Sequence, residues 1–327
     1  MGQIPDCDEL VTSLLEAPLT TPQREALAGL HAGDEELDAG PMDEERLQGI
    51  VGVNSFGDEF SDLASAFALP GQPEPVGHLG LWPSFSMLNH SCAANAVNFV
   101  LGRSMAVFAA RSIPQGSEVL INYLGRSALR PVAERQEALA AGYSFSCDCD
   151  RCRAEMLLGV QGHSGPLDCI QKLLSRCDAR TEALCQPAPP PPALLEEVRA
   201  DAAALHAALS GLGPAEAAWL RASCYDLLSQ HTAAAEAMGA GGEAEEALGA
   251  QLGAVEAVTP HSDLHLFLAV KRLSLLQTRQ GPDSQEAQEQ MGRCVAAVRG
   301  RYGAGLSDGT ALRLLQGVVR GLEQVVV

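Results

Sequence analysis

The chain has 327 residues, 46% of them hydrophobic, and a formal net charge of −19. This length allows one to three domains with a sizeable core. The acidic charge excludes direct nucleic-acid binding as the main role, because phosphate contacts need a Lys/Arg surface. It is compatible either with attraction of basic peptides or with solubility alone.

The apolar pattern, the N-terminus and the cysteines bear on where in the cell the chain is found. No run of about 18 apolar residues is present, so we expect no membrane span. The N-terminus lacks the basic region of a secretory signal. Ten cysteines in such a chain favour a reducing compartment, cytoplasmic and/or nuclear, where clustered cysteines bind metal more often than they form disulfides.

The N-terminal segment, residues 1–46, is acidic and poor in apolar groups, with twelve Asp/Glu against two Lys/Arg over residues 1–50. We expect it to be weakly structured or helical. Helices are expected near 8–15 and 21–30 and within 42–56, and a loop over 71–80.

A β-rich stretch follows. Short apolar runs cover residues 96–101, 104–111 and 118–124, and each predicts a strand. The first two are expected to form a hairpin with Gly102 in the turn. A helix is predicted over 131–141.

The remaining residues are rich in Ala, Leu and Glu and predict paired helices of similar length. A proline run at 186–193 predicts a stiff linker. The low-complexity stretch 234–253 predicts a surface loop or a frayed helix. The expected helices cover residues 165–176, 193–212, 214–231, 243–258, 261–279, 283–302 and 308–325. The fold class expected is α+β followed by an all-α region.

Three thiols lie within six residues, at Cys147, Cys149 and Cys152. Structural Zn²⁺ takes four ligands in a tetrahedron, and thiolate is a preferred donor. Cys92, in another unusual segment, is the best candidate for the fourth, so we expect a zinc site; four free cysteines that cluster by chance are the alternative. Asp148 and Asp150 are hard ligands and should be exposed. His261 and His265 lack a third donor, which favours a helix face or cap.

Three segments resemble known sequences. Residues 81–96, which include Asn-His-Ser-Cys, resemble the corresponding segment of SET-domain protein lysine methyltransferases. Residues 113–123 and 143–152 look like the tyrosine-ending and cysteine-rich segments of the same family, and residues 54–56 are closest to its SMYD subfamily. The resemblance implies a partial SET β-fold, a post-SET zinc loop and a TPR-like domain of helical hairpins.

The implied domains are an N-terminal segment (1–46), the C-terminal part of a SET domain (47–142), a post-SET loop (143–155) and a helical domain (156–327). The implied activity is S-adenosylmethionine-dependent N-methylation of a lysine in a histone or non-histone protein, which we expect to be basic. The family positions match Tyr123 as the catalytic residue, Asn54, Asn89, His90 and Phe145 as cofactor-binding residues, and Phe56 and Tyr143 as the substrate channel.

Simpler roles compete with these. Phe145 could merely pack on the zinc loop, and Tyr123 could be a buried core tyrosine. The chain also departs from the family, since we find neither a Gly-x-Gly strand nor the residues of a MYND zinc finger before residue 46, where Cys7 and His31 stand alone. The alternative function is therefore a catalytically inactive SET remnant that acts as a zinc-containing interaction module through its helical domain.

Overall fold

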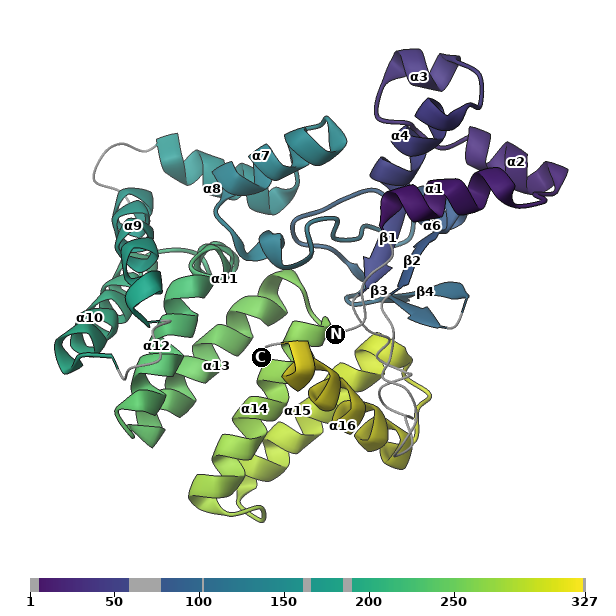
Figure 1. The fold of residues 1–327 in the computed structure, drawn as a ribbon. Coiled ribbons are helices and arrows are strands. Elements are labelled where there is room, and N and C mark those ends of the chain that lie inside the picture. The colour runs from purple at the N-terminus through teal and green to yellow at the C-terminus, as the bar shows by residue number, and fades with distance from the viewer. Residues whose placement is uncertain (1–5, 59–77, 102, 161–165, 185–189, 326–327) are drawn as a thin grey trace.

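The computed structural model describes residues 6–58, 78–101, 103–160, 166–184 and 190–325. Figure 1 shows a mixed fold in which N-terminal helices and short strands lie at one end and an array of helices forms the rest. The expected α+β class is confirmed at this level: a small β region is followed by a largely helical region. None of the helices in these ranges is long and apolar enough to cross a bilayer.

The acidic N-terminal segment is helical. Its elements are α1 (Cys7–Glu16), α2 (Thr21–Ala28), α3 (Glu35–Ala39) and α4 (Glu44–Asn54). The carboxylates of Asp6, Asp34 and Asp43 accept backbone N–H bonds in the first turns of α1, α3 and α4. Val11 and Leu47 are buried between α1 and α4. The short helices expected near 8–15 and 21–30 are confirmed as α1 and α2.

Two antiparallel ladders form the β region. They are β1 (Ser55–Asp58) with β2 (His78–Leu81), and β3 (Ala96–Leu101) with β4 (Ser104–Ala109). The hairpin expected from 96–111 is confirmed, although its second strand ends at Ala109. Gly102 and residues 71–77 of the expected loop lie outside the described residues. Gly80 belongs to β2 and not to a loop. A short helix, α6 (Pro83–Ser86), follows β2.

The third predicted strand, 118–124, is wrong. This stretch runs beside residues 89–96 with one isolated parallel bridge, between His90 and Ile121. The side chain of Asn95 occupies part of the ladder, because its Oδ1 accepts from Leu120 N at 2.8 Å and its Nδ2 donates to the Glu118 carbonyl at 2.9 Å. When a side chain takes the place of a backbone hydrogen-bond partner, the regular ladder between two strands ends there. The pattern of apolar residues in the sequence does not reveal such a bond.

A helical link joins the β region to the rest of the chain. It contains the 3₁₀ helix η1 (Gly125–Leu129), then α7 (Val132–Tyr143) and α8 (Asp150–Val160). The helix expected over 131–141 is thereby confirmed. Ser144 ends α7 with a left-handed conformation, φ 57°, and turns the chain into the cysteine loop. The sequence patterns did not predict α8.

The C-terminal region consists of α9 (Pro166–Leu184), α10 (Pro192–Leu209), α11 (Pro214–Ser223), α12 (Tyr225–Ala237), α13 (Gly241–Val258), α14 (Asp263–Gln280), α15 (Gln285–Tyr302) and α16 (Asp308–Val325). Successive helices from α12 to α16 pack on one another, as expected for hairpins; likeness to TPR repeats stays a prediction. Gly165 and residues 186–189 of the proline run lie outside the described residues.

One helix expected in this region is wrong, and the structure decides between the two alternatives left open for residues 234–253. The helix expected over 214–231 breaks at Cys224. Both α11 and α12 pack on α13, but α11 also packs on α8, whereas α12 also packs on α9. Residues 234–253, expected to be a surface loop or a frayed helix, hold the end of α12 and most of α13, and Ala247 and Leu248 are buried. The helix expected over 243–258 is thereby confirmed. An alanine-rich composition is compatible with both a loop and a helix, and the packing of the segment determines which one forms.

One large apolar core runs through α9–α16 and reaches into the β region. Phe99 of β3 contacts Tyr302 of α15 edge to face, with ring centroids 4.8 Å apart, and stacks on Phe108 of β4 at 5.8 Å. Arg111 donates a hydrogen bond to the Ala257 carbonyl near the end of α13. The hairpin is therefore docked on the helical region.

Candidate functional site: a four-cysteine centre beside a polar and aromatic cavity

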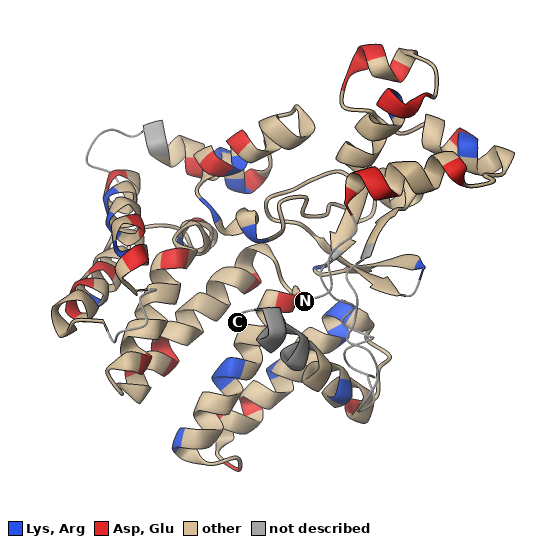
Figure 2. Cartoon of the chain, in the orientation of Figure 1, with Lys and Arg blue, Asp and Glu red and all other residues tan. Residues whose placement is uncertain are grey.

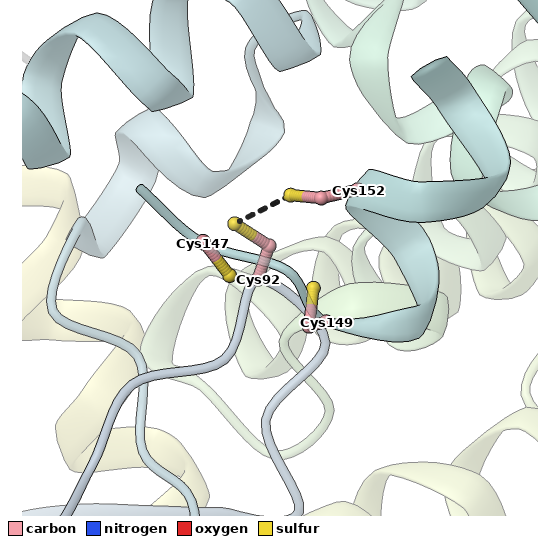
Figure 3. A group of neighbouring side chains, drawn as sticks. All are labelled: Cys92, Cys147, Cys149 and Cys152. Carbon is pink, nitrogen blue, oxygen red and sulfur yellow. Dashed lines mark hydrogen bonds between the residues drawn. The ribbon is translucent and has the colours of Figure 1, made fainter. Parts of the chain in front are cut away.

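The structure brings the four predicted thiols together. The Sγ atoms of Cys92, Cys147, Cys149 and Cys152 all lie within 4.8 Å of one another (Figure 3). Four sulfurs bound tetrahedrally to one zinc at about 2.3 Å would lie ~3.8 Å apart. The sulfurs of Cys92 and Cys152 lie 3.6 Å apart. The cluster therefore has the donor set and spacing that zinc requires, and it can hold such an ion.

Neighbouring side chains hold the ligand loop. Gln136 of α7 brackets Cys147, since its Nε2 donates to the Cys147 carbonyl at 2.6 Å and its Oε1 accepts from the Cys147 N–H at 2.9 Å. His90 Nε2 lies 3.3 Å from the sulfur of Cys92. Cys92, Cys147 and Cys152 are buried. Asp148 and Asp150 are exposed as expected, beside Arg153.

The thiols cannot all ionise independently. Hydrogen bonds with Cys147, Cys149 and Cys152, and then burial, raise the pKa of Cys92. Hydrogen bonds with Cys149, Cys152 and Cys92 lower the pKa of Cys147. Four thiolates at this spacing would repel one another strongly unless a cation lay between them. A divalent ion held by the four sulfurs would allow all of them to be thiolates.

A cavity of about 860 Å³ adjoins the centre. All seven residues predicted for cofactor, catalysis and channel line it: Asn54, Phe56, Asn89, His90, Tyr123, Tyr143 and Phe145. They come from α4, β1, the 89–96 segment, the 118–124 stretch, α7 and the cysteine loop. Cys149 also lines the cavity, so the metal ligands form part of its wall.

Aromatic rings form one side of this cavity. Tyr123 lies 4.9 Å from Tyr143 and 5.2 Å from His90, measured between ring centroids. Phe145 lies 6.1 Å from His90 and 6.5 Å from Tyr143. Phe56 forms a separate edge-to-face pair with Phe85 at 5.9 Å. Such a wall suits a flat heterocycle or an aliphatic chain that carries a cation.

Tyr123 is held from two sides. Its hydroxyl donates a hydrogen bond to the Leu88 carbonyl, and its backbone N–H donates to His90 Nδ1 at 3.1 Å. Burial, and then the neighbouring Tyr143, raise the pKa of Tyr123 above the ordinary tyrosine value. The phenol is therefore neutral near pH 7, with its proton directed at a carbonyl and its oxygen free to accept.

The two asparagines use their amide nitrogens within the protein. Asn54 Nδ2 donates to the carbonyls of His31 at 2.7 Å and Ile50 at 2.8 Å. Asn89 Nδ2 donates to Glu118 Oε1 at 2.7 Å. These bonds fix both side chains at the cavity wall. Their role as cofactor-binding residues stays a prediction.

Sequence reasoning missed several cavity residues, of which His31 is the most informative. His31 lines the cavity, and its Nδ1 is paired with the Asp38 carboxylate. Hydrogen bonds from the Ala32 N–H and from His31 lower the pKa of Asp38. The flanking Gly29 and Gly33, the latter with φ 88°, were the available signal for a tight turn here. Phe85, Ser86 and Glu118 were missed as well.

The His261–His265 pair has a capping role, as expected. Ser262 Oγ accepts from the His265 N–H at 3.2 Å at the start of α14, and His265 Nδ1 accepts from the His261 N–H at 2.9 Å. His265 is buried. Among the residues that the structure describes, neither histidine belongs to a cluster of potential metal ligands.

Comparison with known proteins agrees with the geometry. A model of the SET domain matches residues 22–124. The chain is 41% identical over 78 residues to the protein-lysine N-methyltransferase SMYD4 of Mus musculus, covering 24% of this chain and 10% of that protein. It is 41% identical over 86 residues to the histone-lysine N-methyltransferase SMYD3 of Homo sapiens, covering 25% and 20%.

A plant relative matches a longer stretch. The histone-lysine N-methyltransferase ASHR2 of Arabidopsis thaliana is 31% identical over 114 residues, which cover 32% of this chain and 26% of that protein. The matched segments thus span only about a tenth to a quarter of these relatives. The SET match begins in α2, before the boundary expected at residue 47, and that boundary stays a prediction. The chain carries a SET domain and is a distant, partial relative of the SMYD lysine methyltransferases.

Proposed function

We propose that the chain is an S-adenosylmethionine-dependent protein-lysine N-methyltransferase with a structural zinc. One observation carries the proposal. Seven residues chosen from sequence positions scattered over 54–145 line a single cavity, and the four-cysteine centre forms part of its wall. A chance likeness of short motifs would not be expected to collect them in one place.

The zinc would be held by Cys92, Cys147, Cys149 and Cys152, which leaves no open coordination position. Its contribution is structural, because it fixes the cysteine loop that carries Phe145 and follows Tyr143. The cofactor supplies an electrophilic methyl group on a sulfonium when it is bound. Phe145 offers a ring face to the adenine, and Asn89 and His90 border the same space.

The protein's part is to prepare the lysine. The attacking amine must be neutral, and the rings of Tyr123, Tyr143 and Phe56, which line the cavity, would lower the pKa of a lysine by desolvation. The oxygen of Tyr123, whose proton is bound to the Leu88 carbonyl, can accept from the amine and orient it. Tyr123 then acts by position and not as a base, which agrees with its raised pKa.

The substrate is proposed to be a lysine within a basic protein segment. The chain has 41 Asp and Glu against 22 Lys and Arg. Figure 2 shows acidic residues on the N-terminal helices, which pass into β1 beside the cavity. Such a field increases the rate at which a basic peptide arrives, and the effect should weaken with salt.

The test begins with metal and cofactor binding by the full chain. Metal analysis should find one zinc per chain and less in Cys149→Ala. Calorimetry should detect S-adenosylmethionine at micromolar concentrations. A chain that holds one zinc but gives no heat at high micromolar cofactor would contradict the enzyme and support the zinc-containing interaction module.

Tyr123→Phe then tests the proposed role of the hydroxyl. We expect methyl transfer to a basic peptide to fall roughly 10²-fold, because the amine loses its orienting contact. Cofactor affinity should change little. Tyr225→Phe, in α12 and outside the cavity, is the matched control and should keep full activity. Loss of both cofactor binding and activity in Tyr123→Phe would make this tyrosine structural.

A further inference from the structure

Two buried arginines lie beside the four-cysteine centre. Arg135 of α7 and Arg151 of α8 are both 0% exposed. Glu155 and Ser223 are 2% and 4% exposed and contact both of them. Removing charged groups from water is costly unless they are paired. The proposed methyl transfer does not use these four residues, so their burial needs another explanation.

Arg135 reaches the metal centre directly. Its Nη2 donates to the sulfur of Cys152 at 3.5 Å. Its Nη1 bonds to the Arg130 carbonyl at 2.5 Å and to Glu155 Oε2 at 3.2 Å. The Nε atom of Arg135 is buried without a hydrogen-bond partner in the described part of the chain. A guanidinium left partly unsatisfied is better tolerated next to an anionic centre than in an apolar core.

Arg151 holds the other half of the ligand set. Its Nη1 donates to the carbonyl of Cys92 at 3.1 Å and to that of Ala128 at 2.7 Å. Its Nε donates to Glu155 Oε1 at 2.7 Å. One guanidinium therefore ties the backbone of Cys92 to the helix that carries Cys152.

The charges in this cluster do not cancel by themselves. Two guanidinium groups face one carboxylate, which leaves one buried positive charge. A zinc ion with four thiolates carries two negative charges, so the centre and the arginines attract each other at close range. Without the centre's negative charge, the excess positive charge would be buried with no counterpart within the cluster.

The network also reaches the helical region. Ser223 is the last residue of α11, and its Oγ accepts from Arg151 Nη2 at 2.9 Å and from Arg135 Nη1 at 3.2 Å. The Ser223 hydroxyl donates to Glu155 at 3.2 Å. A residue of the helical region thus takes part in the hydrogen bonding of both arginines.

We propose that Arg135 and Arg151 are positioning residues that retain zinc in the four-cysteine centre, and that Ser223 makes the helical region part of this retention. The arginines offset the negative charge of the centre and fix its ligands, while Glu155 and Ser223 hold the arginines. This inference rests on the proposed zinc centre but not on methyl transfer.

The experiment measures the rate at which zinc leaves the folded full chain when an excess of a chromophoric chelator is added. Arg135→Gln should release zinc roughly 10- to 100-fold faster than wild type, as expected when the outer shell of a metal site is lost. Arg135→Lys keeps the charge and should fall between the two. Ser223→Ala should release zinc several-fold faster, although it touches no ligand.

Arg180→Gln is the matched control. Arg180 is also buried, 7% exposed, and bonds to a carboxylate, Asp201, at 2.6 Å, but it lies in α9 within the helical core. It should lower global stability and leave zinc release unchanged. Equal acceleration by Arg180→Gln and Arg135→Gln would overturn the proposal, because general loosening would then explain both.

The remaining outcomes separate this inference from the proposed function. A wild-type chain without zinc would contradict the zinc centre itself. One zinc per chain with wild-type release in Arg135→Lys, Arg135→Gln and Ser223→Ala would overturn the present inference alone. If Arg135→Gln fails to fold, the conservative Arg135→Lys and Ser223→Ala decide, since release at the wild-type rate in both contradicts the proposal.

Discussion

The four-cysteine region and the helical region use the same residue type in opposite ways. At the centre, four cysteines from segments far apart in the chain converge on one point (Figure 3). In α9–α16, Cys177, Cys224 and Cys294 are 0% exposed and pack among leucines. Burial raises the pKa of Cys177 and of Cys294 to about 11, so these thiols stay neutral. The surroundings of a cysteine therefore decide whether it can serve as a metal ligand or packs as a small apolar side chain.

The difference extends to what stabilises each region. The centre has a small apolar cluster around Leu139 and depends on polar contacts and, we propose, on metal. The helical region has a large continuous core, which is formed mainly by neighbouring helices (Figure 1). We therefore expect the helical core to be stable without metal, and the cavity wall to depend on it.

Metal removal is the strongest test of this contrast. Structural zinc contributes on the order of 10 kcal/mol in small metal-dependent units. Stripping it should abolish hydrogen-exchange protection around residues 88–95 and 143–152, whereas α13–α15 should stay protected. Exchange mass spectrometry of the loaded and stripped chain measures this. Loss of protection across α13–α15 would show that the regions do not fold separately.

Cys294→Ala is the control for that experiment. It removes a thiol from the helical core and none from the centre. The variant should keep its zinc. A zinc deficit in Cys294→Ala would mean that damage to the core propagates to the centre.

Core truncation probes the other side of the comparison. Leu266 of α14 is 0% exposed, and Leu266→Ala should lower the free energy of unfolding by about 2–5 kcal/mol in urea titration, because it leaves a cavity. Leu15→Ala, at a side chain that is 52% exposed, should cost far less. Zinc content should be unchanged in both. If zinc content fell together with the free energy of unfolding, the helical core and the metal centre would not be independent.

The two regions also differed in how far their sequence predicted them. The thiols were predicted from their spacing, because ligand chemistry restricts residue type at such positions. The cavity residues were predicted from the resemblance to SET-domain methyltransferases. Most helices of α9–α16 were predicted from composition and caps. The break at Cys224 was missed, since it depends on which neighbours α11 and α12 pack against. Long-range packing of this kind leaves no local signal.

Contacts between distant residues explain the other errors. Asn95 replaces backbone partners of the 118–124 stretch, so an apolar run that predicts a strand forms none. His31, from the acidic N-terminal segment, lines the cavity, and its carbonyl accepts a hydrogen bond from the Asn54 side chain. Arg135 and Arg151 lie in helices whose sequence gives no reason to expect buried charge. Each case is decided by a partner far along the chain.

Acid should destabilise the helical region through His265. Burial, and then His261, lower the pKa of His265 to about 4, below the unfolded value of about 6.5. The unfolded chain therefore binds the proton first as the pH falls. The stability linked to this group is complete above about pH 6.5 and is lost between about pH 6.5 and 4, at most on the order of 3 kcal/mol.

His265→Asn isolates that effect. Its Oδ1 can still accept from the His261 N–H, but it does not titrate. The free energy of unfolding, measured by denaturant titration, should fall less steeply between pH 6.5 and 4 in this variant. His206→Gln, at an exposed histidine of α10, should keep the wild-type slope. Identical slopes in His265→Asn and wild type would assign the acid sensitivity to other groups.

The loss of one helix cap has the smallest expected effect, and it tests most sharply whether the helical region is stable independently of the metal centre. Ser284 caps α15, where its Oγ accepts from the Ala287 N–H at 3.3 Å. Ser284→Ala should cost about 1 kcal/mol of unfolding free energy, and Ser284→Gly only a few tenths, because glycine is tolerated at this position. If the helical region is stable by itself, the cost is the same in zinc-loaded and zinc-stripped protein, since distant sites add. A different cost in the two forms would mean that α15, which contacts the β3–β4 hairpin through Tyr302 and Phe99, transmits the state of the metal centre into the helical core.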